Sequence, residues 1–158
     1  PEGGTVTAGN ACPLNDGAAA ALMLSAEKAA ELGLKPRAKI IGAVAGGVEP
    51  EYMGVGPIPA VEKLLKRTGL SVCDIDLFEI NEAFAAQVLP SAEKLNIPID
   101  KINIQGGAIA VGHPFGMTGA RIMGTLLNNL ETHDKQFGLE TMCVAGGQGM
   151  AIIVERLN

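Results

Sequence analysis

Three side chains able to do acid–base or acyl-transfer chemistry follow or end segments that the sequence predicts as strands. They are the amide of Asn81, the imidazole of His113 and the thiol of Cys143. Each leads into a turn or a helix start, and the lengths between them fit repeated strand–helix units. Because ligand sites of open α/β sheets gather beyond strand ends, we expect the three groups to meet at one edge of one sheet.

His113 lies between Gly112 and Pro114, at the start of the most regular helical pattern in the chain. The partial positive charge of a helix start lowers the pKa of an imidazole and keeps the ring neutral. A neutral imidazole can donate one hydrogen bond to a developing oxyanion. A helix cap or a core histidine is the structural alternative, and the neighbouring glycine and proline favour the functional role.

Asn81 and Cys143 each admit a structural and a functional interpretation. Asn81 suits the N-cap of the next helix, and Glu82 suits its first turn. The amide of Asn81 equally suits a group that holds a water or a substrate oxygen. Cys143 suits a small core residue, but it precedes Ala-Gly-Gly-Gln-Gly, whose bare backbone amides favour an oxyanion pocket. The residues leave open whether Cys143 is a nucleophile or an acid–base group.

The predicted elements alternate between strands and helices. Strands are predicted at 18–25, 39–48, 75–80, 141–144 and 151–154, with a glycine-rich hairpin joining the last two, and 101–105 is predicted as a short strand or an extended segment. Helices are predicted at 26–32, 57–68, 82–94 and 117–133. Pro90 is expected to kink or divide the third helix. This order predicts an α/β fold in which a mixed sheet carries helices on both faces.

Composition restricts the class of protein. With 158 residues, 47% hydrophobic and 18% charged, the chain has the composition of one folded domain rather than a disordered segment. A net charge of −5 without a basic run favours neither nucleic acid nor an acidic surface as partner, and no apolar run reaches the length of a membrane span. Cys12, Cys73 and Cys143 form neither a disulfide framework nor a metal motif, so we expect reduced thiols, no metal and a cytoplasmic protein.

Several motifs together resemble the C-terminal half of a thiolase, an acetyl-CoA acyltransferase, over essentially the whole chain. They are Val6–Asn10, Asn15–Ala19, Met53–Pro57, Asn81–Gln87, Gly106–Ala110 with Gly112–Pro114, and Cys143 with its glycines. The stretch 112–121 is the most diagnostic. The resemblance implies the layered thiolase fold, with residues 1–17 as a lead-in segment and residues 18–158 as the C-terminal domain.

The resemblance also implies roles for single residues. Cys143 is the thiol that protonates the departing acetyl-CoA enolate in cleavage, or removes the α-proton in condensation. His113 and a water held by Asn81 stabilise the enolate oxygen. Substrate and coenzyme contacts are implied at Ala8, Gly9, Cys12, Met53, Ala83, Phe84 and Ala145. Of these, Met53 and Phe84 line the acyl and pantetheine pocket.

Three features depart from the family pattern. The acyl-accepting cysteine of thiolases belongs to an N-terminal half that is absent here, and neither Cys12 nor Cys73 stands in a matching motif. Cys12 stands where many members have a serine near the thioester, and a thiol is a weaker hydrogen-bond partner. Ala145 stands where members usually have a glycine that completes a second oxyanion hole. Its methyl group clashes there if the backbone needs a positive φ.

The resemblance thus implies the C-terminal catalytic half of a degradative 3-ketoacyl-CoA thiolase, acting in thiolysis or in the reverse Claisen condensation. Coenzyme A is a co-substrate, and no bound cofactor is expected. The expected partners are acyl-CoA, the N-terminal half, and further copies in a homodimer or homotetramer. The missing initiator methionine suggests a fragment or a processed half, whose uncovered apolar surface favours self-association.

Two alternatives remain at this point. The first is a non-catalytic thiolase-like module that binds acyl-CoA or assembles with partner subunits, since the nucleophile is absent. The second is a free-standing hydrolase in which Cys143 is the nucleophile and His113 sets its protonation state.

Overall fold

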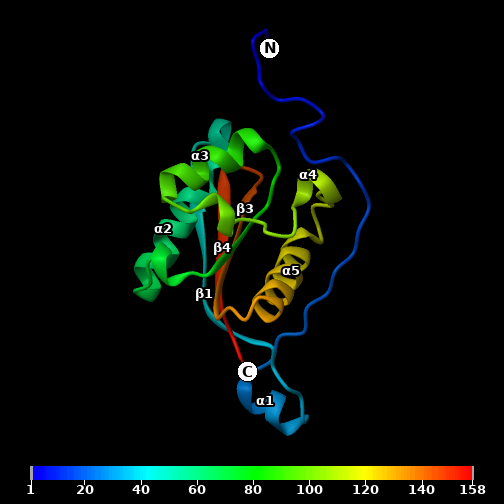
Figure 1. Cartoon of the computed structure of the whole chain (residues 1–158), viewed down its shortest axis with the longest axis vertical. Helices are drawn as coiled ribbons and strands as arrows, with labels where there is room; N and C mark the ends of the chain where they lie inside the picture. Colours follow the sequence, from blue (N-terminus) through cyan, green and yellow to red (C-terminus); the bar gives the residue numbers. More distant parts are fainter. Residues whose placement is uncertain (1, 158) are drawn as a thin grey trace.

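Four strands form one mixed sheet in the order β1-β4-β3-β2, in a computed structural model that describes residues 2–157 (Figure 1). The strands are β1 (Ala38–Gly47), β2 (Leu77–Ile80), β3 (Phe137–Val144) and β4 (Gln148–Arg156). β4 pairs antiparallel with both β1 and β3, whereas β2 pairs parallel with β3. The predicted mixed sheet is therefore confirmed.

Helices cover both faces of this sheet. α2 (Pro57–Thr68) and α3 (Ala85–Leu95) pack on one face, and α5 (Thr118–Thr132) packs on the other (Figure 1). The shorter elements are α1 (Ala26–Glu31), α4 (Ala108–Val111), η1 (Pro50–Val55), η2 (Val72–Asp74) and η3 (Ile99–Lys101). Since successive strand residues point to opposite faces, Phe78 and Ile153 join the core under α2, whereas Leu77 and Val154 join the core under α5.

Most of the predicted elements are confirmed, with ends that move by a few residues. The helix predicted at 57–68 has these bounds, ending at Gly69, which adopts a left-handed φ of 74°. The two C-terminal strands are longer than predicted and form the expected hairpin. Of the two outcomes predicted for Pro90, a kink or a division, the structure contradicts the division, since α3 continues through it. Proline has no N–H, so the carbonyl of Ala86, four residues earlier, lacks its usual donor in the helix. Ala86 is exposed, and water can replace that donor.

One predicted strand is wrong. Residues 18–25 are extended but pair with no other described segment, and Leu22 and Met23 are 77% and 72% exposed. A strand needs a neighbour for its backbone groups, and the described chain offers none along this path, which runs outside the α5 face (Figure 1). The sequence pattern shows that a segment is apolar, and it does not show whether a partner strand is at hand.

The segment 101–105, predicted as a short strand or an extended segment, makes one parallel bridge, between Ile102 and Phe78. Asn103 then takes the place of further strand pairing, with φ at 47°. Its side-chain oxygen accepts from the Ile80 N–H at 2.9 Å, and its amide nitrogen donates to the Ile80 carbonyl at 2.8 Å. One side chain thus satisfies the open edge of β2, and the pairing stops there.

Two carboxyl groups face α5 from adjacent strands. Glu79 of β2 and Glu140 of β3 are partners in the parallel register and are 2% and 5% exposed. Burial raises the pKa of Glu79 to about 7 and that of Glu140 to about 8, while the positive charge of Arg121 on α5 opposes both shifts. Asn129 donates to Glu79 Oε1 at 3.3 Å. The pair therefore retains at least one proton near neutral pH.

This burial predicts how stability depends on pH. The pKa of Glu140 is raised from 4.5 to about 8 by folding, so the folded protein holds this proton through a pH range in which the unfolded chain has lost it. The free energy of unfolding therefore falls as pH rises through that range. Replacing Glu140→Gln removes the titration. We expect the variant to exceed wild type by about 1–3 kcal/mol near pH 8.5, with a smaller difference near pH 5.5.

Thermal unfolding followed by circular dichroism at the two pH values measures this effect. The matched control is Glu93→Gln, because Glu93 is an exposed carboxylate on α3 and its replacement should leave the pH dependence unchanged. An equal loss of stability with rising pH in wild type and Glu140→Gln would contradict the argument.

Candidate active site

The parallel pairing of β2 and β3 brings Asn81 and Cys143 to one edge of the sheet. Asn81 directly follows β2, and Cys143 is the last residue but one of β3. The Asn81 N–H donates to the carbonyl of Thr141 at 3.0 Å, so the chain leaving β2 lies beside the end of β3. Because parallel strands share one direction, these two ends open on the same side.

His113 reaches this edge from the loop between α4 and α5. Only residues 133–136 separate the end of α5 from β3, so α5 begins at the carboxyl ends of the strands that it covers. Glu82, beside Asn81, holds α4, which precedes this loop: its carboxylate accepts from the Ile109 N–H at 3.0 Å and from Asn103 Nδ2 at 2.8 Å. Glu82 lies outside α3, contrary to expectation, and ties the end of β2 to the segment that carries His113.

The side chain of Asn81 is buried and has no partner. It is 1% exposed, and neither its amide nitrogen nor its oxygen makes a hydrogen bond within the described protein. The structural interpretation expected Asn81 to cap α3. It does not, because that helix starts at Ala85 with Phe84 in the N-cap position. A buried amide without a partner is costly, so its retention favours a role in binding a water or a substrate oxygen.

The imidazole of His113 is 8% exposed and lies between a hydroxyl and an aromatic ring. Its Nδ1 is 2.6 Å from Thr118 Oγ1, and its ring meets that of Phe115 edge to face at 4.9 Å between centroids and 62° between planes. Burial lowers the pKa of His113, and the charge of Arg121 lowers it further. The ring is therefore neutral, as predicted, and burial and the charge of Arg121 are the causes that the structure shows.

The thiol of Cys143 is held in its protonated form. It is 5% exposed, and burial raises its pKa, with a smaller contribution from Cys12 and an opposing backbone hydrogen bond. A protonated thiol is suited to giving a proton to carbon and is a poor nucleophile. This protonation favours the acid–base alternative over a resting thiolate nucleophile.

The turn after Cys143 accommodates Ala145 without strain. Gly146 and Gly147 adopt φ of 84° and 83°, whereas the non-glycine residues with positive φ in the described chain are Asn96, Asn103 and Asp134. The expected clash of the Ala145 methyl group therefore does not arise, and this residue keeps an exposed backbone position in the turn. Gln148 steadies the turn by donating from Nε2 to the Ala145 carbonyl at 3.0 Å.

The lead-in segment contributes Cys12 to the same region. Its N–H donates to the Ala83 carbonyl at 3.0 Å, and the preceding Ala11 bridges to Phe84. Burial also raises the pKa of the Cys12 thiol. The ring of Phe84 stays 39% exposed, so an apolar surface remains open beside this junction.

The other three implied contact residues, Met53, Ala8 and Gly9, lie outside this junction. Met53 is half-buried in η1, where the neighbouring Gly54 packs against Gln87 of α3. Ala8 and Gly9 lie in an exposed turn that Asn10 closes by accepting from the Thr7 N–H at 2.7 Å. The structure therefore joins Cys12 to Ala83 by a hydrogen bond and places Ala11 beside Phe84.

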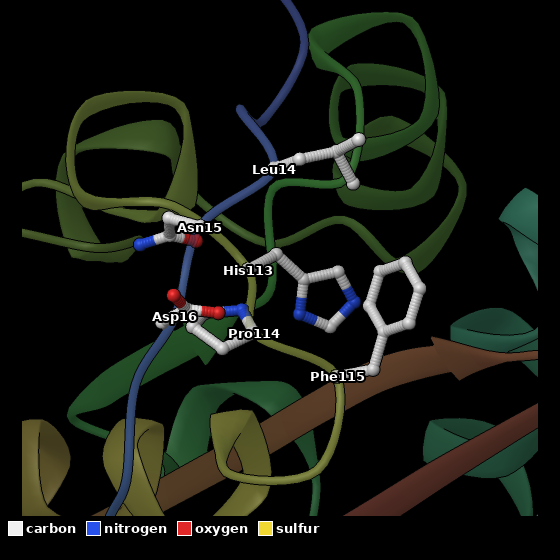
Figure 2. Close-up of a pocket in the computed structure, with 6 residues that line it drawn as sticks. All are labelled: Leu14, Asn15, Asp16, His113, Pro114 and Phe115. Carbon is white, nitrogen blue, oxygen red and sulfur yellow. The ribbon is translucent and has the colours of Figure 1, made fainter.

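An open cleft of about 370 Å³ lies beside His113. Leu14, Asn15 and Asp16 of the lead-in segment line it together with His113, Pro114 and Phe115 (Figure 2). Asn15 donates to the Val111 carbonyl at 3.0 Å, and a side chain at Gly112, where φ is 92°, would collide with Asn15. Glycine is therefore required at 112 for both its backbone conformation and its close approach to the lead-in segment.

Thr118 and Glu82 are site residues to which the sequence interpretation gave no chemical role. The available signal for Thr118 was a hydroxyl five residues after a histidine at a helix start, and this pattern is common. Glu82 gave a misleading signal, because a carboxylate near a predicted helix start suggests that helix as its partner. In the described residues, no group of three or more histidine, cysteine, aspartate or glutamate side chains is placed to hold a metal ion.

Comparison with known proteins assigns almost the whole chain to two family descriptions. Residues 34–156 match the thiolase C-terminal domain, and residues 1–27 match the thiolase N-terminal domain. The 3-ketoacyl-CoA thiolase of Colwellia psychrerythraea is 55% identical over 159 residues, and that of Salmonella typhimurium is 56% identical over 160 residues. Each match covers 99% of this chain and 41% of the relative, so the chain corresponds to the C-terminal part of such proteins.

Solved structures agree on the fold. The acetyl-CoA acetyltransferase of Bacillus anthracis superposes with a TM-score of 0.91 at 44% identity, covering 96% of this chain and 39% of that one. Human mitochondrial 3-ketoacyl-CoA thiolase superposes with a TM-score of 0.90 at 38% identity, covering 97% of this chain and 39% of its own. The layered fold expected from the sequence is confirmed.

Two glycines allow the backbone contact that supports the turn after Cys143. A Cβ atom built on Gly149 would collide with the Gly56 carbonyl, and one built on Gly56 would collide with the Gln148 carbonyl. Gly149 is also the register partner of Cys143 across the hairpin. The start of α2 therefore presses directly on the strand pair that carries the thiol.

We expect Gly149→Ala to lower the free energy of unfolding by about 1–3 kcal/mol, because backbone on both sides must move to admit the methyl group. The matched control is Gly124→Ala in α5, where an added Cβ meets no atom within 4 Å. Alanine at this helical position should stabilise the protein by about 0.5–1 kcal/mol. Denaturant unfolding measures both values, and a neutral Gly149→Ala would disprove the tight contact.

Proposed function

The chain belongs to the thiolase family, and on that basis we propose that it is the C-terminal catalytic part of a 3-ketoacyl-CoA thiolase. The full-length protein cleaves a 3-ketoacyl-CoA with coenzyme A and yields acetyl-CoA and a shortened acyl-CoA, or runs the reverse Claisen condensation. The observation that carries the proposal is the pairing, at one sheet edge, of an unpartnered buried amide at Asn81 with a protonated thiol at Cys143.

Cleavage of the carbon–carbon bond leaves the enolate of acetyl-CoA, whose charge lies on oxygen and whose carbon needs a proton. Asn81 and His113 serve the oxygen: the amide of Asn81 holds a water, and the imidazole lies at the start of α5. Hydrogen bonds from fixed groups in a buried site act more strongly than in water. Cys143 gives its proton to the carbon, and its thiolate recovers a proton from the thiol of coenzyme A.

The raised pKa of Cys143 affects proton transfer in both directions of the proposed reaction. Carbon acids next to a thioester are very weak, so a thiol of ordinary acidity gives a thiolate too weak to remove their proton in the condensation direction. Burial makes the Cys143 thiolate a stronger base. The difference between the pKa of this thiol and the pKa of the carbon acid therefore becomes smaller. The same burial keeps the thiol protonated near neutral pH, as the cleavage direction requires.

The coenzyme side of the site is proposed from the surface around Cys143. Phe84 and Met53 offer apolar area for the acyl chain and the pantetheine arm. Backbone near Ala8, Gly9 and Ala83 contacts that arm, and Cys12 and Ala145 lie near the thioester. Coenzyme A acts as co-substrate, and no resident cofactor takes part in this chemistry.

An N-terminal part supplies the acyl-accepting cysteine in this proposal. Exposed apolar side chains along the lead-in segment and beside the cleft offer a surface that this N-terminal part can cover. Leu14 is 88% exposed and Phe115 is 72% exposed. Residues 1–27 also match the thiolase N-terminal domain. We further propose a homodimer or homotetramer in the cytoplasm, where the three free cysteines remain reduced.

The net charge of −5 opposes an association with nucleic acid. Within residues 2–157, no helix is both long and apolar enough to cross a bilayer.

Thiolysis of acetoacetyl-CoA by the full-length protein tests the proposal. We expect Cys143→Ala to lower kcat about 10²- to 10⁴-fold, because no other group delivers the proton to carbon. Cys73→Ala is the control, since Cys73 is an exposed thiol in η2. Asn81→Ala should lower kcat about 10²- to 10³-fold through loss of oxyanion stabilisation. Full activity of Cys143→Ala would refute the acid–base role, and coenzyme A binding without any thiolysis would leave a binding module.

The uncovered apolar surface gives a second prediction, for the 158-residue chain expressed alone. Light scattering should show oligomers or aggregates, because Leu22 and Met23 expose 77% and 72% of their area. The double replacement Leu22→Ser with Met23→Ser should reduce the association. A monodisperse monomer at high concentration would show that no partner segment is needed to cover this surface.

A further inference from the structure

Thr118 makes the hydrogen bond that orients the imidazole of His113. It is the first residue of α5 and is 0% exposed. Its Oγ1 lies 2.6 Å from His113 Nδ1 and 3.1 Å from the carbonyl oxygen of Pro114. Thr118 is the hydrogen-bond partner that the described chain provides for this ring.

The protons on these atoms can be assigned from what each atom can donate. A threonine hydroxyl has one proton to give and can accept as well, whereas the Pro114 carbonyl can only accept. The hydroxyl therefore donates to Pro114, and its oxygen accepts from Nδ1–H of His113. The reverse arrangement, in which the hydroxyl donates to Nδ1, makes one hydrogen bond in place of two.

The Pro114 carbonyl has room for this donor. It also accepts from the Met117 N–H at 3.0 Å, and a carbonyl oxygen has two lone pairs. The other groups at the ring do not oppose the assignment. Phe115 meets the ring edge to face, and Arg121 disfavours a positive charge on it. Glu79 and Glu140 face Arg121, and the carboxyl group of Asp16 lines the cleft beside His113.

We propose that Thr118 is a positioning residue that fixes neutral His113 as the Nδ1–H tautomer, with the lone pair on Nε2. In the proposed function, Nε2 takes the proton that the acyl-accepting thiol loses when it bonds to the substrate carbonyl, and it donates to the enolate oxygen only after it has taken that proton. This changes the expectation from the sequence, in which the neutral ring was itself the donor. The tautomer stands on the geometry alone, whereas its use in catalysis rests on the proposed function.

Nitrogen-15 spectra of the full-length protein, labelled at histidine, test the tautomer directly. At a pH above the pKa of the ring, the spectrum shows which ring nitrogen carries the proton, and His113→Asn identifies the signals. We expect a protonated Nδ1 and a bare Nε2 in wild type. A proton on Nε2 of the neutral ring would overturn the proposal, whatever the activity of the protein.

Substitutions at Thr118 test the cause. Thr118→Val keeps the shape but removes the hydroxyl, so Nδ1–H should lose its dominance. Thr118→Ser should preserve it. Thr125→Val is the matched control, because Thr125 makes the same bond to a carbonyl four residues earlier in α5, at 3.1 Å, and has no hydrogen bond to His113. An unchanged tautomer in a folded Thr118→Val variant would overturn the proposal; if that variant fails to fold, the wild-type and Thr118→Ser spectra decide.

Kinetics provide the second readout. Thr118→Val should lower kcat about 10- to 100-fold, as loss of a group that orients a catalytic side chain typically does, with KM little changed. Loss of the acceptor for Nδ1–H also lowers the pKa of the imidazolium, so the acidic limb of the pH–rate profile should move to lower pH. Thr118→Ser should restore both. Failure of thiolysis in wild type with the expected tautomer would defeat the proposed function and leave the assignment of Thr118 intact.

Discussion

The parallel pairing of β2 with β3 is the constraint on which the site depends. It brings the end of β2, with Asn81, beside the end of β3, with Cys143, through a backbone hydrogen bond from Asn81 to Thr141. A one-residue slip of this pairing would turn every side chain of β2 to the opposite face. Asn103 helps to hold β2 in place by satisfying its outer edge, where no further strand adds. The strand pairing by itself thus sets the positions of Asn81 and Cys143, independently of the helices.

Burial then determines what these groups can do. The thiol of Cys143 stays protonated, the imidazole of His113 stays neutral, and the amide of Asn81 keeps its hydrogen-bonding capacity for another molecule. None of the three carries a charge of its own, so they suit charge that develops at the reacting atoms. On the α5 face, the carboxyl groups of Glu79 and Glu140 follow the same rule by retaining protons. The structure therefore links stability and chemistry through one physical cause.

The sequence predicted the features whose signals are local. The bounds of α2 follow from prolines at its start and a glycine at its end, and the hairpin after Cys143 follows from its glycines. Residues 18–25 were predicted wrongly because a strand depends on a partner that no local pattern reveals. The facing of Glu79 and Glu140 depends on register, and the contact between Thr118 and His113 depends on how a five-residue turn folds back. The sequence thus predicted the candidate residues and a neutral imidazole, whereas the raised pKa of the Cys143 thiol and the contacts of Glu82 and Thr118 required the fold.

The central claim is that the edge formed by β2 and β3 handles a proton on carbon. Exchange of the acetyl methyl protons of acetyl-CoA with deuterium oxide, followed by mass spectrometry in the presence of the full-length protein, tests it most directly. We expect catalysed exchange in wild type and its loss when Cys143 is replaced by alanine, since the thiol is the group that moves the proton. Exchange that continues at the wild-type rate without the thiol would contradict the account.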